Sequence, residues 1–205
     1  MCGRYTLQIS HHPKLMALGL PLADRFNIAP QSEVLVIESE GEYALKPWDY
    51  SPSWAREPMR LTNARSETLR EKPAFRKADR CVFVADGWYE WQRRDGQKQP
   101  WYHHRGGDLF YMAGVYQPGI GCAVVTQGAT EPLARVHHRQ PVLLDEQHLG
   151  AWLNGAQSSD ELPTLEISFH PVSTRVGNVQ YDDSELIVPV DIDEVRAGQT
   201  ADLFS

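Results

Sequence analysis

The residue with the most unusual potential chemistry is Cys2. If Met1 is removed, as a small second side chain normally permits, Cys2 carries a free α-amine and a thiol on one residue. In free peptides the amine titrates at about 7.7 to 8.0 and the thiol at about 8.5, so both are close to activation at neutral pH. We expect the neighbouring Arg4 to favour the thiolate and to lower the thiol pKa further.

Two reactions suit this pair of groups. In an N-terminal-nucleophile hydrolase, the α-amine of Cys2 acts as the base for its own side chain. Alternatively, the amine and the thiol both add to one aldehyde carbon, giving a Schiff base that the sulfur closes into a five-membered thiazolidine ring. A terminal cysteine with no chemical role is the simplest third interpretation. The choice depends on groups elsewhere in the chain.

A carboxylate suited to acid–base chemistry stands just after a hydrophobic segment. Residues 80–85 include a continuous apolar run, and Glu90 follows it between Trp88 and Trp91. Desolvation raises the pKa of a carboxylate, and a glutamate that titrates near neutrality suits proton transfer. The alternative is a surface glutamate on an alternating strand.

The run Val136–Pro141 concentrates proton carriers and positive charge. Histidine is the usual proton shuttle at physiological pH, which makes His137 and His138 candidates for that role. Arg139 can hold a phosphate in its guanidinium fork. A metal site is disfavoured, because adjacent histidines point in different directions and no acidic third ligand lies nearby in the sequence.

Two further segments hold weaker signals. Asn63 and Arg65 can direct an amide and a guanidinium at one site, although capping of a helix over residues 63–70 explains them equally well. Trp54, in a loop between two prolines, suits stacking on an exposed base as well as it suits the core. Each signal is weak when it is taken alone.

Composition bounds the class of protein. The chain has 205 residues, of which 41% are hydrophobic and 23% charged, as in one globular domain. Its three cysteines show no CxxC or Cys/His spacing, so neither a disulfide framework nor a structural zinc site is expected, and a reducing, cytoplasmic setting fits best. No apolar run approaches the length of a membrane span, and the start of the chain lacks the pattern of a signal peptide.

The net charge of −7 is unevenly distributed. From Asp182 onward seven acidic residues stand against one arginine, whereas residues 1–181 carry a net charge of only −1. A local basic groove for nucleic acid is therefore compatible with an acidic protein. Residues 191–205 are predicted to form an acidic, mobile tail on a domain that spans residues 1–190.

The hydrophobic pattern predicts many short strands, scattered short helices and no βαβ rhythm. The expected fold is α+β, a single domain with a curled, barrel-like, mainly antiparallel sheet flanked by short helices. Strands are expected at 34–38, 43–48, 80–85, 100–104, 109–116, 122–126 and 169–172, and helices or helical turns at 11–20, 63–70, 131–136 and 145–153.

Taken together, these segments resemble the SRAP family (SOS-response-associated peptidases), the abasic-site processing proteins. The resemblance spans roughly residues 1–190 and has seven motifs in order: Met1-Cys2-Gly3-Arg4, Arg25–Pro30, Pro52-Ser53-Trp54, Asn63–Thr68, Asp86–Trp91, Val136–Pro141, and His170–Ser173 with Val176-Gly177-Asn178.

The resemblance implies an enzyme that senses abasic sites in single-stranded DNA. The ring-opened sugar of such a site presents an aldehyde, which Cys2 captures as a thiazolidine, leaving a stable DNA–protein cross-link. The implied activity is lyase-like, with an autopeptidase activity beside it. By the same resemblance Glu90 assists ring opening and proton transfer, Asn63 hydrogen-bonds the linkage, and His137 transfers protons at the Schiff base. The residues implied to contact DNA are Arg4, Pro30, Trp54, Arg65, Thr126 and Arg139.

This chemistry needs no metal or organic cofactor, and none is expected. The expected partner is single-stranded DNA with an abasic site, bound by a cytoplasmic monomer that associates with the nucleoid when it is on DNA. Two residues depart from the family pattern. Gln140 stands where a methionine or a basic residue is usual, and Asp49 replaces part of a Trp-Gly-Leu-like run, where an acid would repel phosphate unless it faces away.

Two other functions stay open on the sequence. An N-terminal-nucleophile peptidase would use the thiol of Cys2, with His137 or Glu90 as its base. A reader of single-stranded DNA would bind reversibly and in a salt-dependent way, with Cys2 merely buried.

Overall fold

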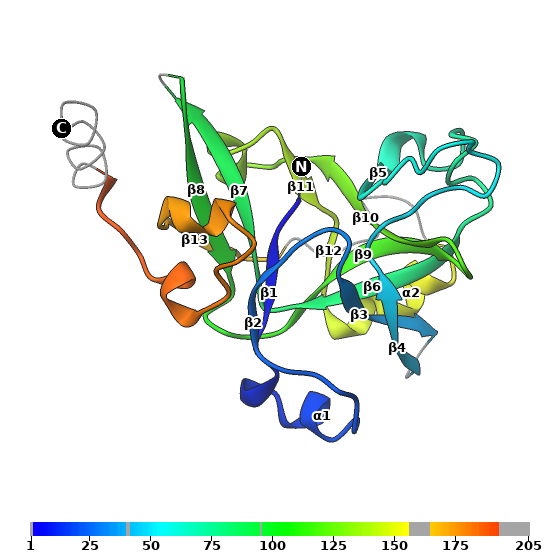
Figure 1. Ribbon diagram of the computed structural model, residues 1–205, viewed down its shortest axis with the longest axis horizontal. Helices are drawn as coiled ribbons and strands as arrows, with labels where there is room; N and C mark the ends of the chain where they lie inside the picture. The colour runs from blue at the N-terminus through cyan, green and yellow to red at the C-terminus, as the bar shows by residue number, and fades with distance from the viewer. Residues whose placement is uncertain (1, 40–41, 95, 156–164, 193–205) are drawn as a thin grey trace.

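The computed structural model describes residues 2–39, 42–94, 96–155 and 165–192. Most of these residues belong to strands or loops, and the helices are few and short. The α+β class expected from the sequence is confirmed. The strands pair into two sheets that lie side by side (Figure 1). The predicted mobile tail falls largely on residues 193–205, which lie outside the described residues.

The first sheet has five strands in the order β13-β8-β7-β1-β2. All neighbouring strands in this sheet are antiparallel, and β2 forms one edge, next to β1. Its members are β1 (Tyr5–Leu7), β2 (Arg25–Ile28), β7 (Gly87–Arg94), β8 (Gln97–His104) and β13 (Ser168–Pro171).

The second sheet follows the order β11-β10-β9-β6-β3-β4, with β12 paired to β9 and β5 paired to β10. The β5–β10 pair is parallel and the other pairs are antiparallel. Its members are β3 (Glu33–Ser39), β4 (Glu42–Pro47), β5 (Asn63–Arg65), β6 (Asp79–Ala85), β9 (Phe110–Gln117), β10 (Gly121–Gly128), β11 (Arg139–Pro141) and β12 (Leu143–Leu144). Within the described residues neither sheet closes on itself, so the barrel-like sheet expected from the sequence is not confirmed.

The chain crosses from the second sheet to the first between β6 and β7. Asp86 lies buried at the crossing, and its carboxylate accepts hydrogen bonds from the Thr6 hydroxyl at 2.5 Å and the Gln8 backbone N–H at 2.7 Å. Gly87 follows, and a Cβ there would lie 2.2 Å from the hydroxyl oxygen of Tyr102. These contacts fix the bend to β1, the strand that leads away from the N-terminus. The bend places the apolar run within 80–85 in β6 of the second sheet and the following segment, which holds Glu90, in β7 of the first.

The helical segments are shorter than the sequence predicts. A helix expected over 11–20 is reduced to a 3-10 turn and one short α-helix, and 131–136 holds only a 3-10 turn. The segment expected at 145–153 is confirmed as a 3-10 turn followed by an α-helix. The α-helices that lie within the described residues are α1 (Pro13–Met16) and α2 (Leu149–Leu153), and the described 3-10 turns are η1 (Ile9–His11), η2 (Ser66–Thr68), η3 (Leu133–Arg135), η4 (Glu146–His148), η6 (Thr174–Gly177) and η7 (Ser184–Ile187).

The helix predicted over residues 63–70 is wrong. Residues 63–65 form β5, which runs parallel to β10, and only η2 behind it is helical. The side chain of Ala64 is buried by this pairing. Capping residues are local signals, whereas the strand pairing joins segments about sixty positions apart, and the long-range pairing prevails.

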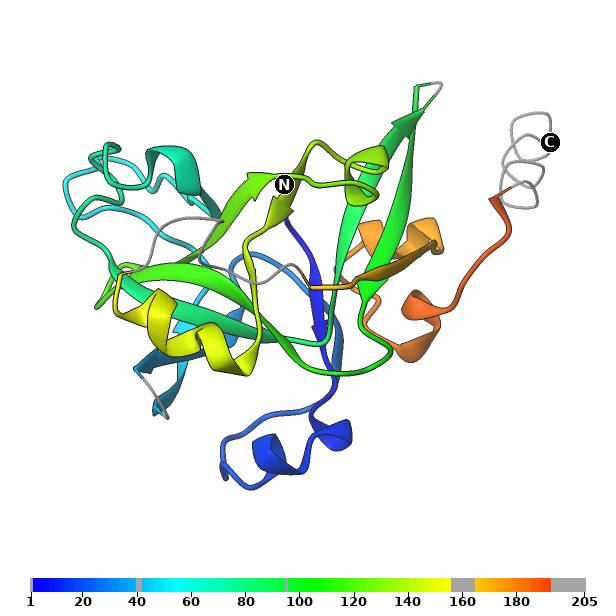
Figure 2. The ribbon, with the colours of Figure 1, turned by 180° about the vertical axis from the view of Figure 1, so that it is seen from behind.

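One hydrophobic core joins the two sheets. The rings of Tyr5, Trp48 and Phe83 meet edge to face there, with centroids 5.5 to 6.4 Å apart. Cys2 belongs to the same core. Helix α2 lies against the second sheet (Figure 2). Its Trp152 is buried there, and the indole N–H donates to the Cys81 carbonyl at 2.8 Å.

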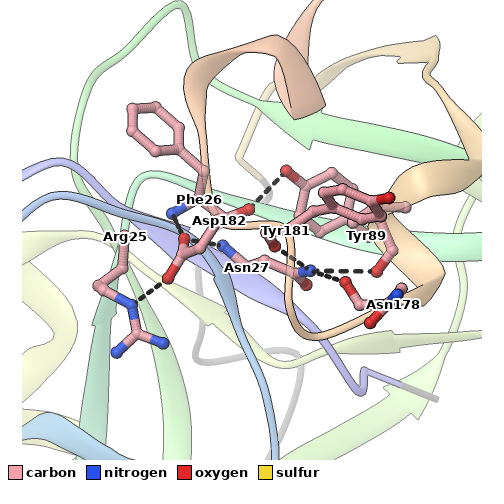
Figure 3. Close-up of polar contacts among 8 residues, drawn as sticks. Arg25, Phe26, Asn27, Tyr89, Asn178, Tyr181 and Asp182 are labelled. Carbon is pink, nitrogen blue, oxygen red and sulfur yellow. Dashed lines mark hydrogen bonds and ion pairs between the residues drawn. The ribbon is translucent and has the colours of Figure 1, made fainter.

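The segment after β13 is fastened to the edge strand β2 (Figure 3). The carboxylate of Asp182 accepts hydrogen bonds from the backbone N–H groups of Phe26 at 2.5 Å and Asn27 at 2.8 Å, and it pairs with the guanidinium of Arg25. Asn27 is 1% exposed, and its Nδ2 donates at 2.8 to 3.2 Å to three carbonyl oxygens, those of Val176, Asn178 and Tyr181. The edge of the first sheet is therefore covered rather than open to solvent.

Candidate active site and nucleic-acid interface

Cys2 lies where the two sheets meet. It directly precedes the segment that becomes β1, and its backbone carbonyl accepts a hydrogen bond at 2.8 Å from Nδ2 of Asn63 on β5. Figures 1 and 2 show the segment that leads into β1 close to β11. The Cys2 side chain is fully buried, with Sγ 3.9 Å from the Arg4 carbonyl oxygen. The residue is therefore held from both sheets.

The Cys2 thiol is not activated as the sequence predicts. Burial, followed by the negative charge of Glu90, raises its pKa above the ordinary value. The Arg4 guanidinium is half-buried and turns back to donate to the Gly3 carbonyl at 2.9 Å. The lowered thiol pKa expected from Arg4 is therefore wrong, because desolvation outweighs a basic neighbour in the sequence. At neutral pH the thiol keeps its proton, and any reaction at sulfur has to remove it.

Glu90 is a buried carboxyl group that titrates near neutrality. It lies on β7 with only 3% of its surface exposed, and burial raises its pKa to about 7. This agrees with the direction expected from its position after the apolar run. A carboxyl group with this pKa is present in both protonation states at pH 7, so it can donate and accept a proton.

His137 approaches Glu90 from the other sheet. Its Nδ1 lies 3.8 Å from Oε2 of Glu90, which is too long for a direct hydrogen bond. The same Nδ1 accepts a hydrogen bond from the Arg139 backbone N–H at 3.1 Å. Desolvation lowers the pKa of His137, so its ring is neutral at pH 7. Of the four residues predicted to be catalytic, Asn63 thus donates to the Cys2 backbone and His137 lies near Glu90, whose charge acts on the Cys2 thiol.

Arg139 is engaged within the protein. Its Nη1 and Nη2 donate to the two carboxylate oxygens of Glu67 at 2.5 and 3.0 Å, and Nη2 also donates to the Thr126 carbonyl at 2.6 Å. This ion pair lowers the pKa of Glu67 to about 2. Glu67 could not be predicted as part of the site from the sequence, because its partner stands 72 positions away and no local pattern joins the two.

The other residues expected to contact DNA lie at different depths. Arg65 is exposed on β5 and lies opposite the buried Thr126 of β10 in the parallel register. Arg4 and Pro30 are half-buried, with Pro30 just after β2. Trp54 is 60% exposed, which rules out the interpretation that it belongs to the core.

Trp54 lines a groove of about 580 Å³ in the loops that lead to and from β5. Arg76 and Lys77 line the same groove and are exposed. Residues 51–80 hold eight lysine or arginine residues against four acids, so this part of an acidic protein is basic. The sequence analysis missed both cations, since charges in a loop are usually solvated and only the fold brings these beside a tryptophan.

Comparison with known proteins decides the family. The sequence profile described as SOS response associated peptidase (SRAP) matches residues 1–179. The chain belongs to the SRAP family. The abasic site processing protein YedK of Escherichia coli (strain K12) is 31% identical over 223 residues, which cover 93% of this chain and 100% of YedK. The abasic site processing protein HMCES of Gallus gallus is 32% identical over 194 residues, which cover 71% of this chain and 56% of HMCES.

Solved structures share the fold of this SRAP protein. A protein from Bacteroides thetaiotaomicron superposes with a TM-score of 0.75 over 93% of this chain and 100% of its own, at 19% identity. A phage-related protein from Bordetella bronchiseptica superposes with a TM-score of 0.66 over 83% of this chain and 94% of its own, at 27% identity.

The two departures from the SRAP pattern occupy different environments. Gln140 is buried on β11, and its Oε1 accepts a hydrogen bond from the Thr130 N–H at 3.0 Å, which ties down one end of the loop that carries His137. Asp49 is half-buried between two buried aromatic residues. Across the described part of the SRAP chain no group of three or more His, Cys, Asp and Glu side chains could hold a metal ion. No described helix is long and apolar enough to cross a membrane.

Proposed function

We propose that this SRAP protein captures abasic sites in single-stranded DNA as a covalent thiazolidine on Cys2, after removal of Met1, and so protects the lesion. The proposal is carried by one observation, the burial of Cys2 beside a carboxyl group whose pKa is about 7. That arrangement suits proton transfer at an aldehyde better than it suits a thiolate nucleophile. The relatives YedK and HMCES are named abasic site processing proteins, which supports it.

The raised pKa of the thiol sets the order of the steps. The α-amine of Cys2 adds first to the aldehyde carbon, and Glu90 in its acid form protonates the departing hydroxyl, so that water leaves and a Schiff base remains. The Schiff base nitrogen still carries one proton, so the carboxylate of Glu90 then takes the thiol proton as Sγ bonds to the same carbon, the electron pair of the C=N bond returns to the nitrogen, and Glu90 is again in its acid form. Asn63 holds the Cys2 backbone, and neutral His137 assists as a second proton carrier.

Binding of the strand would use the basic loops around β5. Arg65 lies at the surface beside the site, and Arg4 and Arg139 lie deeper in it. The exposed ring of Trp54, with Pro30 nearby in the proposed path, would stack on bases and take the place of a complementary strand. The proposed partner is thus single-stranded DNA, bound by a cytoplasmic monomer that joins the nucleoid through the DNA.

Mixing the Met1-free protein with an oligonucleotide that holds one abasic site tests the proposal. We expect a shifted band on a denaturing gel without borohydride, and no band for Cys2→Ala. Cys2→Ser should cross-link poorly unless the Schiff base is reduced. Absence of a band with correctly processed wild-type protein would contradict the proposal. Reversible, salt-dependent binding alone would favour the reader, and release of a leader peptide that depends on Cys2 would reveal an autopeptidase activity.

Replacing Glu90 by Gln should slow cross-linking by about 100-fold at pH 7, the lower range for loss of a general acid–base group. Because the pKa of Glu90 is about 7, its acid form declines above pH 7 while the free Cys2 amine increases up to about pH 8, so the wild-type rate should pass through a maximum between about pH 7 and 8 and fall above it. Single-turnover rates from pH 5.5 to 9 measure this. If Glu90→Gln keeps the same descending limb, Glu90 is not the titrating group.

A further inference from the structure

The Arg139 guanidinium already holds an anion in the geometry that suits a phosphate. Glu67 places both carboxylate oxygens on two guanidinium nitrogens, at 2.5 and 3.0 Å. Arginine forms this two-pronged pair equally with a carboxylate and with two phosphate oxygens. The carboxylate of Glu67 therefore occupies the place that a backbone phosphate would take.

The two partners of Arg139 differ in how firmly they can hold it. The carbonyl of Thr126, a buried residue on β10, accepts from Nη2 at 2.6 Å and fixes the guanidinium from inside the protein. Glu67 approaches from the solvent side, on the short turn η2, and its side chain is 51% exposed whereas that of Arg139 is 11% exposed. Departure of Glu67 would uncover a guanidinium that stays oriented.

This pair lies beside the proposed reaction site. The Arg139 backbone N–H donates to the Nδ1 of His137, which faces Glu90. Arg65 lies opposite Thr126 in the β5–β10 register, so a second, exposed guanidinium stands on the neighbouring strand. A phosphate on Arg139 would place the adjacent sugar near the proton carriers.

We propose that Glu67 is an internal substitute for a DNA phosphate, which the strand displaces from Arg139 when it binds. This inference rests on the proposed function and deepens it. With Glu67 in place the Arg139–Glu67 pair has no net charge, so polyanions in general gain little from Arg139. A strand that places a phosphate at Arg139 exchanges the Glu67 carboxylate for that phosphate on a guanidinium that is already oriented. Binding there therefore depends on where the phosphate lies more than on the total charge of the strand.

The test measures binding of a fluorescein-labelled single-stranded oligonucleotide by anisotropy in a Cys2→Ala background, from 50 to 300 mM NaCl. Glu67→Gln should tighten binding about fivefold, because it releases Arg139 from an ion pair of ordinary surface strength. The slope of log K against log salt should stay nearly unchanged, because the strand contacts Arg139 in both proteins once Glu67 is displaced; a slope steeper by about 0.7, the contribution of one more phosphate contact in a single strand, would mean that wild type makes no such contact and would overturn the exchange. Glu146→Gln, which removes an acid paired to Lys14 at 3.2 Å, is the matched control and should change the affinity much less.

A scan with single neutral methylphosphonate linkages separates exchange from general repulsion. The gain from Glu67→Gln should disappear at one linkage, the one that faces Arg139. If Glu67→Gln tightens binding at every linkage, Glu67 only repels the strand by its charge. If Glu67→Gln leaves binding weaker or unchanged, either Glu67 orients Arg139 or Arg139 contacts no phosphate. Each of these results overturns the exchange. Cross-linking by wild-type protein is scored in parallel, so that failure of the proposed function is seen separately.

Discussion

A protein that keeps one extra residue ahead of Cys2 will form no abasic-site cross-link that survives a denaturing gel without reduction. Capture as a thiazolidine requires the amine and the thiol on the same residue, and an amide nitrogen does not add to an aldehyde. Every side chain of the site is intact in such a protein, yet the yield should fall by about 1,000-fold or more, the scale on which an intramolecular nucleophile is lost. Quantitative gels with an abasic-site oligonucleotide measure the loss.

The control for this experiment has to show that the fold is unchanged. A glycine inserted between Met1 and Cys2 leaves a small terminal residue, and mass spectrometry verifies which residue is first. Cys2 is fully buried, and its backbone carbonyl accepts a hydrogen bond from Asn63 at 2.8 Å. The midpoint of thermal unfolding of the extended protein should therefore also be compared with that of wild type. A normal cross-link yield from the extended protein would show that the thiol acts without its neighbouring amine, and the thiazolidine would be ruled out.

The strands of the second sheet could be predicted because their sequences are continuously apolar. The runs within 80–85, 109–116 and 122–126 become β6, β9 and β10, which lie next to one another in the sheet. The division into two sheets could not be predicted in the same way. It depends on the bend after β6, where the Asp86 carboxylate accepts a hydrogen bond from Thr6, eighty positions earlier in the chain.

The candidate site, too, has features that the sequence predicts and features that depend on the fold. The chemical types of Cys2, Glu90 and His137 indicated proton transfer and an aldehyde, and the raised pKa of Glu90 follows from its apolar surroundings. The thiol pKa was predicted in the wrong direction, because the sequence places Arg4 close by but does not show that Cys2 is buried. The partnership of Glu67 with Arg139 likewise exists only because β5 and β10 pair. The chemical types of the site residues can be predicted from the sequence, whereas their desolvation and their ion pairs depend on the fold.

Asp182→Ala should lower the free energy of unfolding by about 3 kcal/mol, because hydrogen bonds to a charged acceptor are worth roughly 1.5 to 3 kcal/mol and the losses are not additive. The substitution leaves the backbone N–H groups of Phe26 and Asn27 without their acceptor and Arg25 without its partner. Urea unfolding at pH 7 measures the change. The acidic stretch that begins at this residue thus has a structural role at its start, in addition to its charge.

The neighbouring aspartate provides the matched control for that measurement. Asp183 accepts the Glu185 N–H at 3.1 Å as the cap of η7 and pairs with Arg175 at the surface. Asp183→Ala removes the same charge and should cost about 1 kcal/mol, the usual value of a cap. Equal losses from the two variants would show that charge, and not the covering of β2, determines the effect. Because β2 pairs with β1, a larger loss at Asp182 would mean that the C-terminal segment supports the strand that positions Cys2.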